Sequence, residues 1–357
     1  MALRFGVIGT GMMGCEHLRN LMALPGAEIA AVTDPGAGPR EWARLTLGEG
    51  HPAAVLDGTR ALLARDDLDA VIVASPNHTH AGVLDEVFAA RPDLHVMVEK
   101  PLCTTVADCR AVERAAATRP GLVWVGLEYR YMPPVARFVA EIAAGAAGDL
   151  RMVFVREHRF PFLPKVGDWN RFNRNTGGTL VEKCCHFFDL MRLAVGSDPV
   201  RVYASGAQDV NHLDERYDGE QPDILDNAFV IVDFANGVRG CLDLCMFAEA
   251  SRNEQELVAV GAAGKIEAFV PEGVVRVGSR ATRELREIAA AHDDRIAYQG
   301  FHHGASYLEL LAFCDAVRTG APPAVTVRDG LWATVMGVAA HRSIDEARPV
   351  ACAELLD

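Results

Sequence analysis

The sequence has no long apolar run and no cluster of basic residues, and both absences exclude classes of partner. No apolar run approaches the roughly 20 residues that a membrane-spanning helix needs, so we expect no membrane partner. No Lys/Arg-rich run offsets the formal net charge of −13, which should repel nucleic acid and anionic membranes. We therefore expect no nucleic acid as a partner.

Cysteine is present, but it lacks the spacings that carry a function. The nine cysteines are irregularly spaced and contain no Cys-x-x-Cys, so they indicate neither a disulfide framework nor a zinc site. The apolar run after Arg4 ends at Gly9, which is too short for an export signal. These features predict a cytoplasmic protein with reduced, mostly buried thiols.

The 357 residues suffice for two domains, and the pattern of residues 1–126 differs from that of residues 127–357. In the first range, apolar strands alternate with helical patterns. The expected strands are 4–8, 28–33, 70–74, 95–98 and 122–126, and the expected helices are 12–22, 39–47, 80–90 and 106–117. Strands that are apolar on both faces and followed by helices predict an α/β domain of the Rossmann type, a doubly wound parallel sheet.

Residues 127–357 predict an α+β domain with a large, mostly antiparallel sheet. Strand-like runs succeed one another here, at 151–159, 200–207, 228–234, 237–247, 256–261 and 265–269. Asn236-Gly237 is a strong hairpin signal, because both turn positions tolerate a positive φ. Helices are expected over 179–195, from Ser306 onward, and over 330–341, where the last helix could pack back on the first domain.

The strand at 228–234 bears on assembly, because both of its faces are apolar. The helices expected in this domain can cover only one face of the sheet. A second copy of the sheet is the economical cover for the other face. We therefore expect a homo-oligomer, either a homodimer or a homotetramer.

A glycine-rich turn follows the first strand and carries a Gly-x-Gly-x-x-Gly pattern. Gly9 permits the tight turn, Gly11 lets the backbone approach a pyrophosphate, and Gly14 lets helix and strand pack closely. The N-terminus of the next helix offers N–H groups to the phosphates. The predicted cofactor-binding residues of this turn are Gly9, Thr10, Gly11, Met12, Met13 and Gly14.

Asp34, at the end of the second strand, favours NAD as the cofactor. It stands twenty residues beyond Gly14, where the dinucleotide-binding pattern places an acid. A carboxylate there accepts hydrogen bonds from the ribose hydroxyls and would repel the extra phosphate of NADP. The nearest basic residue is Arg40.

Lys100 stands at the carboxyl end of another expected strand, in the sequence Val98-Glu99-Lys100-Pro101. Ligands of open α/β sheets bind at this edge, so the lysine would lie beside the nicotinamide. There it could hydrogen-bond a substrate hydroxyl or carbonyl. By position alone, an ordinary surface lysine at a strand end is an equal alternative.

The helix expected over 179–195 carries a second group of candidates. Glu182 and His186 would lie one turn apart on one face, where an acid could orient a proton-transferring imidazole. A satisfied core histidine is the plain alternative. Lys183 would either reach the edge of a pocket or, as we expect more, point to solvent. Consecutive residues such as Cys184, Cys185 and His186 diverge by about 100° and cannot converge on one metal ion.

Together these motifs resemble the glucose–fructose oxidoreductase, inositol dehydrogenase and rhizopine catabolism family, abbreviated Gfo/Idh/MocA. The resemblance spans essentially the whole chain. It rests on the glycine turn, Ser75-Pro76-Asn77-His78-Thr79-His80, Glu99-Lys100-Pro101, Gly177-Gly178-Thr179-Leu180, the acid–x₃–His helix, Pro322-Pro323 with Val327, and Ser343 with Arg348-Pro349-Val350.

The resemblance implies a Rossmann domain, an open-faced antiparallel sheet that mediates oligomers, and NAD(P)-linked oxidation of a sugar or cyclitol hydroxyl. Carried over, Lys100 is the active-site lysine and His186 the acid/base. The cofactor-binding residues near the nicotinamide would be Ser75, Pro76, Asn77, His78, Glu99 and Lys100. One departure is clear, because the family usually has aspartate where this chain has Glu182, followed here by Lys183.

Further polar and aromatic residues are candidates for the substrate site, in the runs Glu128–Tyr131, Arg156–Arg159 and Lys165–Arg171. A polyhydroxylated ligand wants planar donors and a stacking face, although exposed hairpins can show the same composition. His302-His303 are weaker candidates. With the catalytic candidates included, the predicted substrate-binding residues are Lys100, Tyr129, Arg130, Trp169, Arg171, Glu182, Lys183 and His186.

These observations predict an NAD-dependent dehydrogenase that oxidises a CH–OH of a sugar, polyol or inositol, with Lys100, His186 and Glu182 as catalytic residues. One alternative keeps the cofactor but cleaves a glycoside through transient oxidation and elimination. Another is a non-catalytic sensor of NAD or sugar, against which the presence of both Lys100 and His186 argues.

Overall fold

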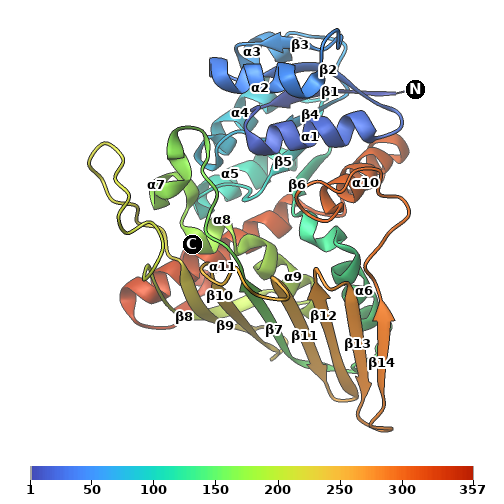
Figure 1. The fold of residues 1–357 in the computed structure, drawn as a ribbon, viewed down its shortest axis with the longest axis vertical. Helices are drawn as coiled ribbons and strands as arrows, with labels where there is room; N and C mark the ends of the chain where they lie inside the picture. Colours follow the sequence, from blue (N-terminus) through green and yellow to red (C-terminus); the bar gives the residue numbers. More distant parts are fainter. Residues whose placement is uncertain (1, 357) are drawn as a thin grey trace. The chain divides into compact units, whose positions relative to one another are not determined.

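The computed structural model describes residues 2–356, which form two compact units, each with its own sheet (Figure 1). Unit 1 comprises Met1–Glu128, Lys165–Trp169 and Arg295–Thr334. Unit 2 comprises Tyr129–Pro164, Asn170–Asp294 and Val335–Asp357. The range expected as a second domain, 127–357, thus contributes segments to both units.

Unit 1 contains a six-stranded parallel sheet in the order β3-β2-β1-β4-β5-β6, which confirms the doubly wound fold. The strand order reverses between β1 and β4, the position at which such sheets bind ligands. The strands are β1 (Leu3–Ile8), β2 (Ala27–Thr33), β3 (Ala54–Leu56), β4 (Ala70–Val73), β5 (His95–Glu99) and β6 (Val123–Gly126).

The helices of unit 1 alternate with these strands, as the sequence predicts. All four residues of β4 are buried, which fits a parallel sheet covered on both faces. β3 and α3 were not expected, because elements of three and five residues are too short to show a period. The helices are α1 (Met12–Ala23), α2 (Ala37–Leu47), α3 (Thr59–Leu63), α4 (His80–Ala90), α5 (Val106–Ala116) and α10 (Ala305–Thr319), with a short 3-10 turn at Asn77–Thr79. A second 3-10 turn, Glu128–Tyr131, begins in unit 1 and continues into unit 2.

Unit 2 contains a nine-stranded sheet in the order β14-β13-β12-β11-β7-β10-β9-β8-β15. All neighbouring strands are antiparallel except β7 and β10, which confirms the predicted mostly antiparallel sheet. The strands are β7 (Leu150–His158), β8 (Pro199–Ala207), β9 (Asn227–Phe234), β10 (Arg239–Cys245), β11 (Gln255–Gly261), β12 (Gly264–Val270), β13 (Val274–Ser279), β14 (Leu285–Ala289) and β15 (Val350–Ala351).

Helices cover one face of this sheet. α6 packs on β11, β12 and β13, and α9 packs on β7. In β9, Val230 and Val232 are buried, whereas Phe229 and Ile231 on the opposite face are 63% and 47% exposed. The helices are α6 (Pro133–Ala143), α7 (Asn173–Thr176), α8 (Thr179–Glu182), α9 (Cys185–Val195) and α11 (Val327–Glu346, which begins in unit 1), with a 3-10 turn at Cys352–Leu355 and another, Val166–Arg171, that also begins in unit 1.

The single helix expected over 179–195 is wrong, because the chain forms two helices there. The N–H groups of Lys183 and Cys184 both point to the carbonyl of Thr179, at 2.9 and 3.4 Å. This widened turn separates α8 from α9. Glu182 therefore ends one helix, and His186 lies in the first turn of the next.

No helix among residues 2–356 combines the length and the apolar character that crossing a membrane requires.

Candidate functional site

The glycine turn of unit 1 joins β1 to α1 and contains two kinds of glycine. Gly9 has a φ of +91°, and a Cβ there would lie 2.6 Å from the backbone nitrogen of Ser75. A Cβ on Gly14 would lie 2.0 Å from the carbonyl oxygen of Gly9. Folding itself therefore requires these two glycines. A Cβ on Gly11 would meet no described atom within 4 Å, so internal packing does not require this glycine.

The open space at Gly11 fits a dinucleotide. Gly11 is the N-cap of α1, no side chain caps this helix, and its first turn contains no acid. The helix N-terminus is thus suited to an anion, and the missing Cβ lets a pyrophosphate approach the backbone. When bound, NAD would be held here by backbone N–H groups.

Asp34 follows β2 and is held by the backbone on both of its oxygens. Oδ2 accepts a hydrogen bond from the N–H of Thr10 at 2.9 Å, and Oδ1 accepts one from Gly36 at 2.8 Å. Arg40 donates to the carbonyl oxygens of Asp34 and Pro35, at 2.7 and 2.8 Å. The carboxylate is therefore tied to the glycine turn, with the guanidinium of Arg40, from the first turn of α2, bonded to the backbone beside it.

Glu99, at the end of β5, places a buried negative charge directly before Lys100. Its Oε1 lies 2.7 Å from Nε2 of His17, and its Oε2 accepts the backbone N–H of Lys100 at 3.2 Å. Burial alone would raise the pKa of Glu99, but the hydrogen bond from His17 and the charges of His17, Lys100 and His302 lower this pKa to about 2. The carboxylate is therefore ionised at neutral pH. Sequence reasoning missed His17, whose only signal is its place on α1.

The loops after β4 and β5 are joined by His80. Its Nδ1 lies 2.9 Å from the carbonyl oxygen of Pro101, and its Nε2 lies 2.9 Å from that of Ser75. Burial lowers the pKa of His80. Of the predicted cofactor residues in the first loop, Asn77 is buried and His78 is exposed, with its ring 6.2 Å from that of Trp169 in the same unit.

His186 lies in unit 2, near the start of α9, and is 2% exposed. The ring of Tyr129 stacks on its imidazole, with centroids 4.0 Å apart and planes 9° from parallel. The phenol oxygen of Tyr129 accepts a hydrogen bond from Nζ of Lys183 at 2.7 Å. The structure thus brings three predicted site residues, Tyr129, Lys183 and His186, into direct contact.

Lys183 does not point to solvent, so that expectation is wrong. It is 5% exposed, and its Nζ lies 2.8 Å from Oε1 of Glu157 on β7. The reason is that Glu157 occupies the covered face of the sheet and is itself fully buried. The sequence placed this glutamate among the substrate-site candidates of the run Arg156–Arg159 and did not predict its pairing with Lys183. Its register with buried Val153 and Val155 is the signal that it faces the core.

The start of α8 is anchored by His341 of α11. Nε2 of His341 accepts the N–H of Leu180 at 3.1 Å. Gly178 has a φ of +89°, and a Cβ there would lie 2.2 Å from the same nitrogen. This contact fixes the helix that ends at Glu182, which is 4% exposed.

The two arginines predicted at the substrate site form internal ion pairs. Arg130 donates two hydrogen bonds to Asp189, at 2.6 and 2.5 Å. Arg171 is 3% exposed and donates to Glu215 at 2.9 Å. Both guanidiniums thus have structural partners, and their contact with a substrate stays a prediction.

Among the described residues, no group of three or more His, Cys, Asp or Glu side chains could hold a metal ion. Burial raises the pKa of the Cys184 thiol, which does not favour the thiolate that a metal would need.

Two family models match the chain. Residues 3–127 match the NAD-binding Rossmann fold of the Gfo/Idh/MocA oxidoreductase family, and residues 139–352 match its C-terminal alpha/beta domain. The chain is 28% identical to a myo-inositol 2-dehydrogenase of Thermotoga maritima, over 99% of this chain and 100% of the relative. It is 27% identical to an NAD(+) scyllo-inositol 2-dehydrogenase of Bacillus subtilis, over 98% and 96%.

A solved structure shares the fold. A levoglucosan dehydrogenase in complex with NADH and levoglucosan superimposes with a TM-score of 0.86 at 21% identity, covering 99% of this chain and 100% of that one. The family match, the glycine turn and the anchored Asp34 agree with one another. The chain therefore belongs to the Gfo/Idh/MocA family and is an NAD-dependent oxidoreductase.

Proposed function

We propose that the enzyme oxidises a secondary alcohol of a cyclitol or related sugar to a ketone. The observation that carries this proposal is the buried imidazole of His186, held flat against Tyr129 in a unit that matches the family's C-terminal domain. The names of the two full-length relatives support an inositol as the substrate class.

His186 is the proposed general base of this reaction. Histidine titrates near neutral pH and can take the proton of the hydroxyl under oxidation. Lys100 donates a hydrogen bond to the substrate oxygen and stabilises its anionic character in the transition state. Glu182 orients the imidazole or accepts a hydrogen bond from a neighbouring hydroxyl. Bound NAD supplies the hydride acceptor.

A substrate screen tests this proposal. The enzyme would be incubated with NAD and inositols, sugars and glycosides, while NADH absorbance and products are followed in parallel. We expect one molecule of NADH to form for each molecule of ketone product. A cleaved glycoside without net NADH would instead assign the elimination reaction. Binding of NAD and sugar without any product would assign a sensor.

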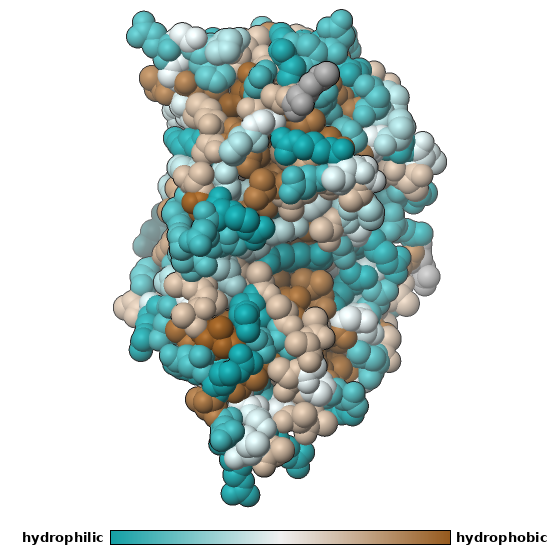
Figure 2. Space-filling model, turned by 90° about the vertical axis from the view of Figure 1, so that its right-hand side faces the viewer, coloured by the Kyte–Doolittle hydropathy of each residue, from teal (hydrophilic) through white to brown (hydrophobic). Residues whose placement is uncertain are grey.

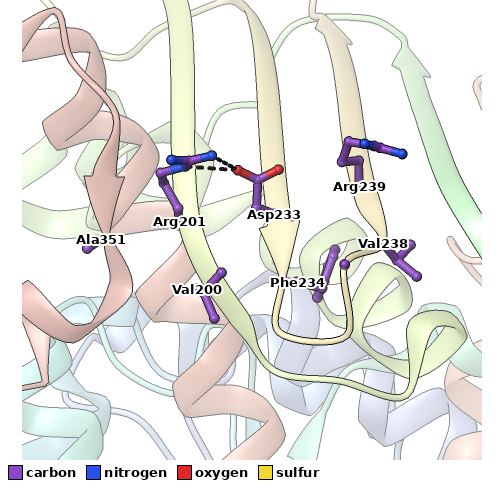
Figure 3. A pocket seen from close by; sticks show the side chains of 8 residues that line it. Val200, Arg201, Asp233, Phe234, Val238, Arg239 and Ala351 are labelled. Atoms are coloured by element: carbon purple, nitrogen blue, oxygen red, sulfur yellow. Dashed lines mark hydrogen bonds and ion pairs between the residues drawn. The ribbon is translucent and has the colours of Figure 1, made fainter.

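We also propose a homodimer or homotetramer that forms through the exposed face of the unit 2 sheet. Tyr203 on β8, Ile231 on β9 and Cys241 on β10 are aligned by the strand register and form an apolar row on this face. Beside it lies the charged row of Arg201, Asp233 and Arg239. Figure 3 shows Arg201 bonded to Asp233, with Arg239 on the neighbouring strand.

The exposed face of the sheet also contains a depression that a partner could fill. A shallow depression of about 420 Å³ lies at the end of β8, β9 and β10, and its lining includes the exposed side chain of Val200 and the charged pair of Arg201 and Asp233 (Figure 3). Figure 2 shows hydrophobic and hydrophilic side chains interspersed on the side of the molecule that it presents. Nine free cysteines suit the cytoplasm, where we place the enzyme.

Light scattering tests the assembly with two matched variants. Ile231→Glu places a charge in the apolar row and should lower the molecular mass toward that of one chain. Leu45→Glu, on α2 of unit 1 and 73% exposed, places the same charge elsewhere and should leave the mass unchanged. An unaltered protein that is monomeric at micromolar concentration would refute the proposed assembly.

A further inference from the structure

The ammonium of Lys183 lies in a buried network that ends at the imidazole of His186. On one side, Lys183 contacts Glu157, which is 0% exposed. On the other side, it donates to the phenol oxygen of Tyr129, and its Nζ lies 4.8 Å from the centre of the Tyr129 ring. Tyr129 in turn stacks on His186. All these residues belong to unit 2.

Glu157 is held on both oxygens. Nε2 of Gln255, directly across on β11, donates to Oε2 at 2.8 Å. On Oε1, Nη1 of Arg159 lies 3.5 Å away and Nζ of Lys183 lies 2.8 Å away. The carboxylate is therefore fixed by the sheet, and the position of the ammonium follows from it.

A buried ion pair of this kind contributes little to net stability. Desolvating two charges costs free energy that an ion pair recovers only with good geometry, and apolar side chains of similar size often serve as well. A buried ion pair does define one arrangement of the groups around it. Here the group that it defines is the phenol of Tyr129, whose ring determines the plane of the imidazole.

We propose that Lys183 and Glu157 are positioning residues for His186 and act through Tyr129. The pair fixes the phenol oxygen, the tyrosine ring then holds the imidazole plane, and the ring nitrogens of His186 stay directed along that plane. A general base transfers a proton efficiently only when its orientation is held within a narrow range. This inference rests on the proposed role of His186 as the base.

The test neutralises both members of the pair at once. Removing one partner alone would leave the other charge buried without its partner and destabilise the fold. We therefore use the double variant Lys183→Met/Glu157→Gln. Its control is Arg276→Met/Glu287→Gln, which neutralises an exposed pair 3.0 Å apart on β13 and β14 of the same unit.

We expect the double variant to lower kcat about tenfold, because a loosely held base samples unproductive orientations. NAD affinity by titration and the melting temperature should stay near those of the unaltered enzyme. The solvent deuterium isotope effect on kcat should rise, since proton transfer becomes more rate-limiting. Lys183→Arg, which keeps the positive charge, should retain more activity, and the control pair should leave kcat unchanged.

Two results would overturn the inference. One is a folded double variant with normal kcat and an unchanged isotope effect. The other is a loss of kcat that only follows the unfolded fraction. If the double variant does not fold, Tyr129→Phe decides, because it keeps the stacked ring and removes the phenol oxygen. A normal kcat in Tyr129→Phe would then refute the inference, and a lowered kcat would support it.

A different result would refute the proposed role of His186 as the base. If His186→Ala keeps a normal kcat, then His186 is not the base. If His186→Ala is inactive while the double variant resembles the unaltered enzyme, only the positioning role is refuted.

Discussion

The glycine turn of unit 1 and the α8–α9 segment of unit 2 hold their functional groups by different means. The turn is a backbone site: Gly9 and Gly14 are required by close contacts, and Asp34 is fixed by two N–H groups. The α8–α9 segment is organised by side chains: the ring of Tyr129 stacks on His186, and its phenol oxygen accepts a hydrogen bond from Lys183. An arrangement held by the backbone is visible in consecutive residues of the sequence, whereas one held by side chains depends on partners far along the chain.

The largest expected effect is a loss of stability that distinguishes Gly14 from Gly11 in the same turn. Gly14→Ala places a Cβ 2.0 Å from the carbonyl oxygen of Gly9 and should destabilise the protein by about 3 kcal/mol. Gly11→Ala meets open space, so stability should stay normal while NAD affinity falls, because the Cβ stands where the pyrophosphate approaches. Urea unfolding and NAD titration check both variants. Equal stability losses in the two would contradict the distinction.

The second prediction concerns the pH dependence of the anchor at α8. Burial lowers the pKa of His341 to about 4 from its ordinary 6.5, and Asp345 and Asp223 oppose this only in part. Between these values the unfolded chain binds more protons than the folded one, so stability should fall as pH drops through this window. The titration of His341 should lower the free energy of unfolding by about 2 kcal/mol when the pH falls from 7 to 5.

Urea unfolding at both pH values checks this prediction against His341→Gln, whose amide does not titrate. We expect the variant to lose less stability on acidification than the unaltered protein. Equal losses in the two proteins would show that His341 does not titrate differently on folding.

The third prediction concerns the choice of cofactor at Asp34. NAD should be preferred to NADP by well over tenfold in kcat/KM, because the carboxylate repels the extra phosphate. Asp34→Ser should narrow this ratio, because it removes the charge that repels the extra phosphate. Steady-state kinetics with both cofactors measure the ratio. Equal use of both by the unaltered enzyme would overturn the assignment.

The smallest expected effect belongs to Glu182. Glu182→Gln keeps the shape of the side chain but removes its charge, and we expect kcat/KM to fall about threefold to tenfold. Glu182→Asp should retain more activity, because it restores the charge with a slightly shorter reach. Kinetics on the best substrate of the screen measure both variants. If Glu182→Gln behaves as the unaltered enzyme does, the acid is structural only.

The same contrast explains how much the sequence could predict. The parallel sheet, the glycine turn and Asp34 were predictable, because strand periodicity and glycine spacing are local signals. The break between α8 and α9 was not, since it depends on how Lys183 and Cys184 share the carbonyl of Thr179. The partners Glu157, His17 and His341 lie far along the chain from the residues that they hold.

The most direct test of the central claim compares catalysis with cofactor binding in two variants. Lys100→Ala and His186→Ala should each lower kcat by about 10² or more, because each removes a group that acts in the transition state. NAD affinity, measured by titration, should barely change in either variant. A His186→Ala enzyme with nearly normal kcat would contradict the proposed mechanism.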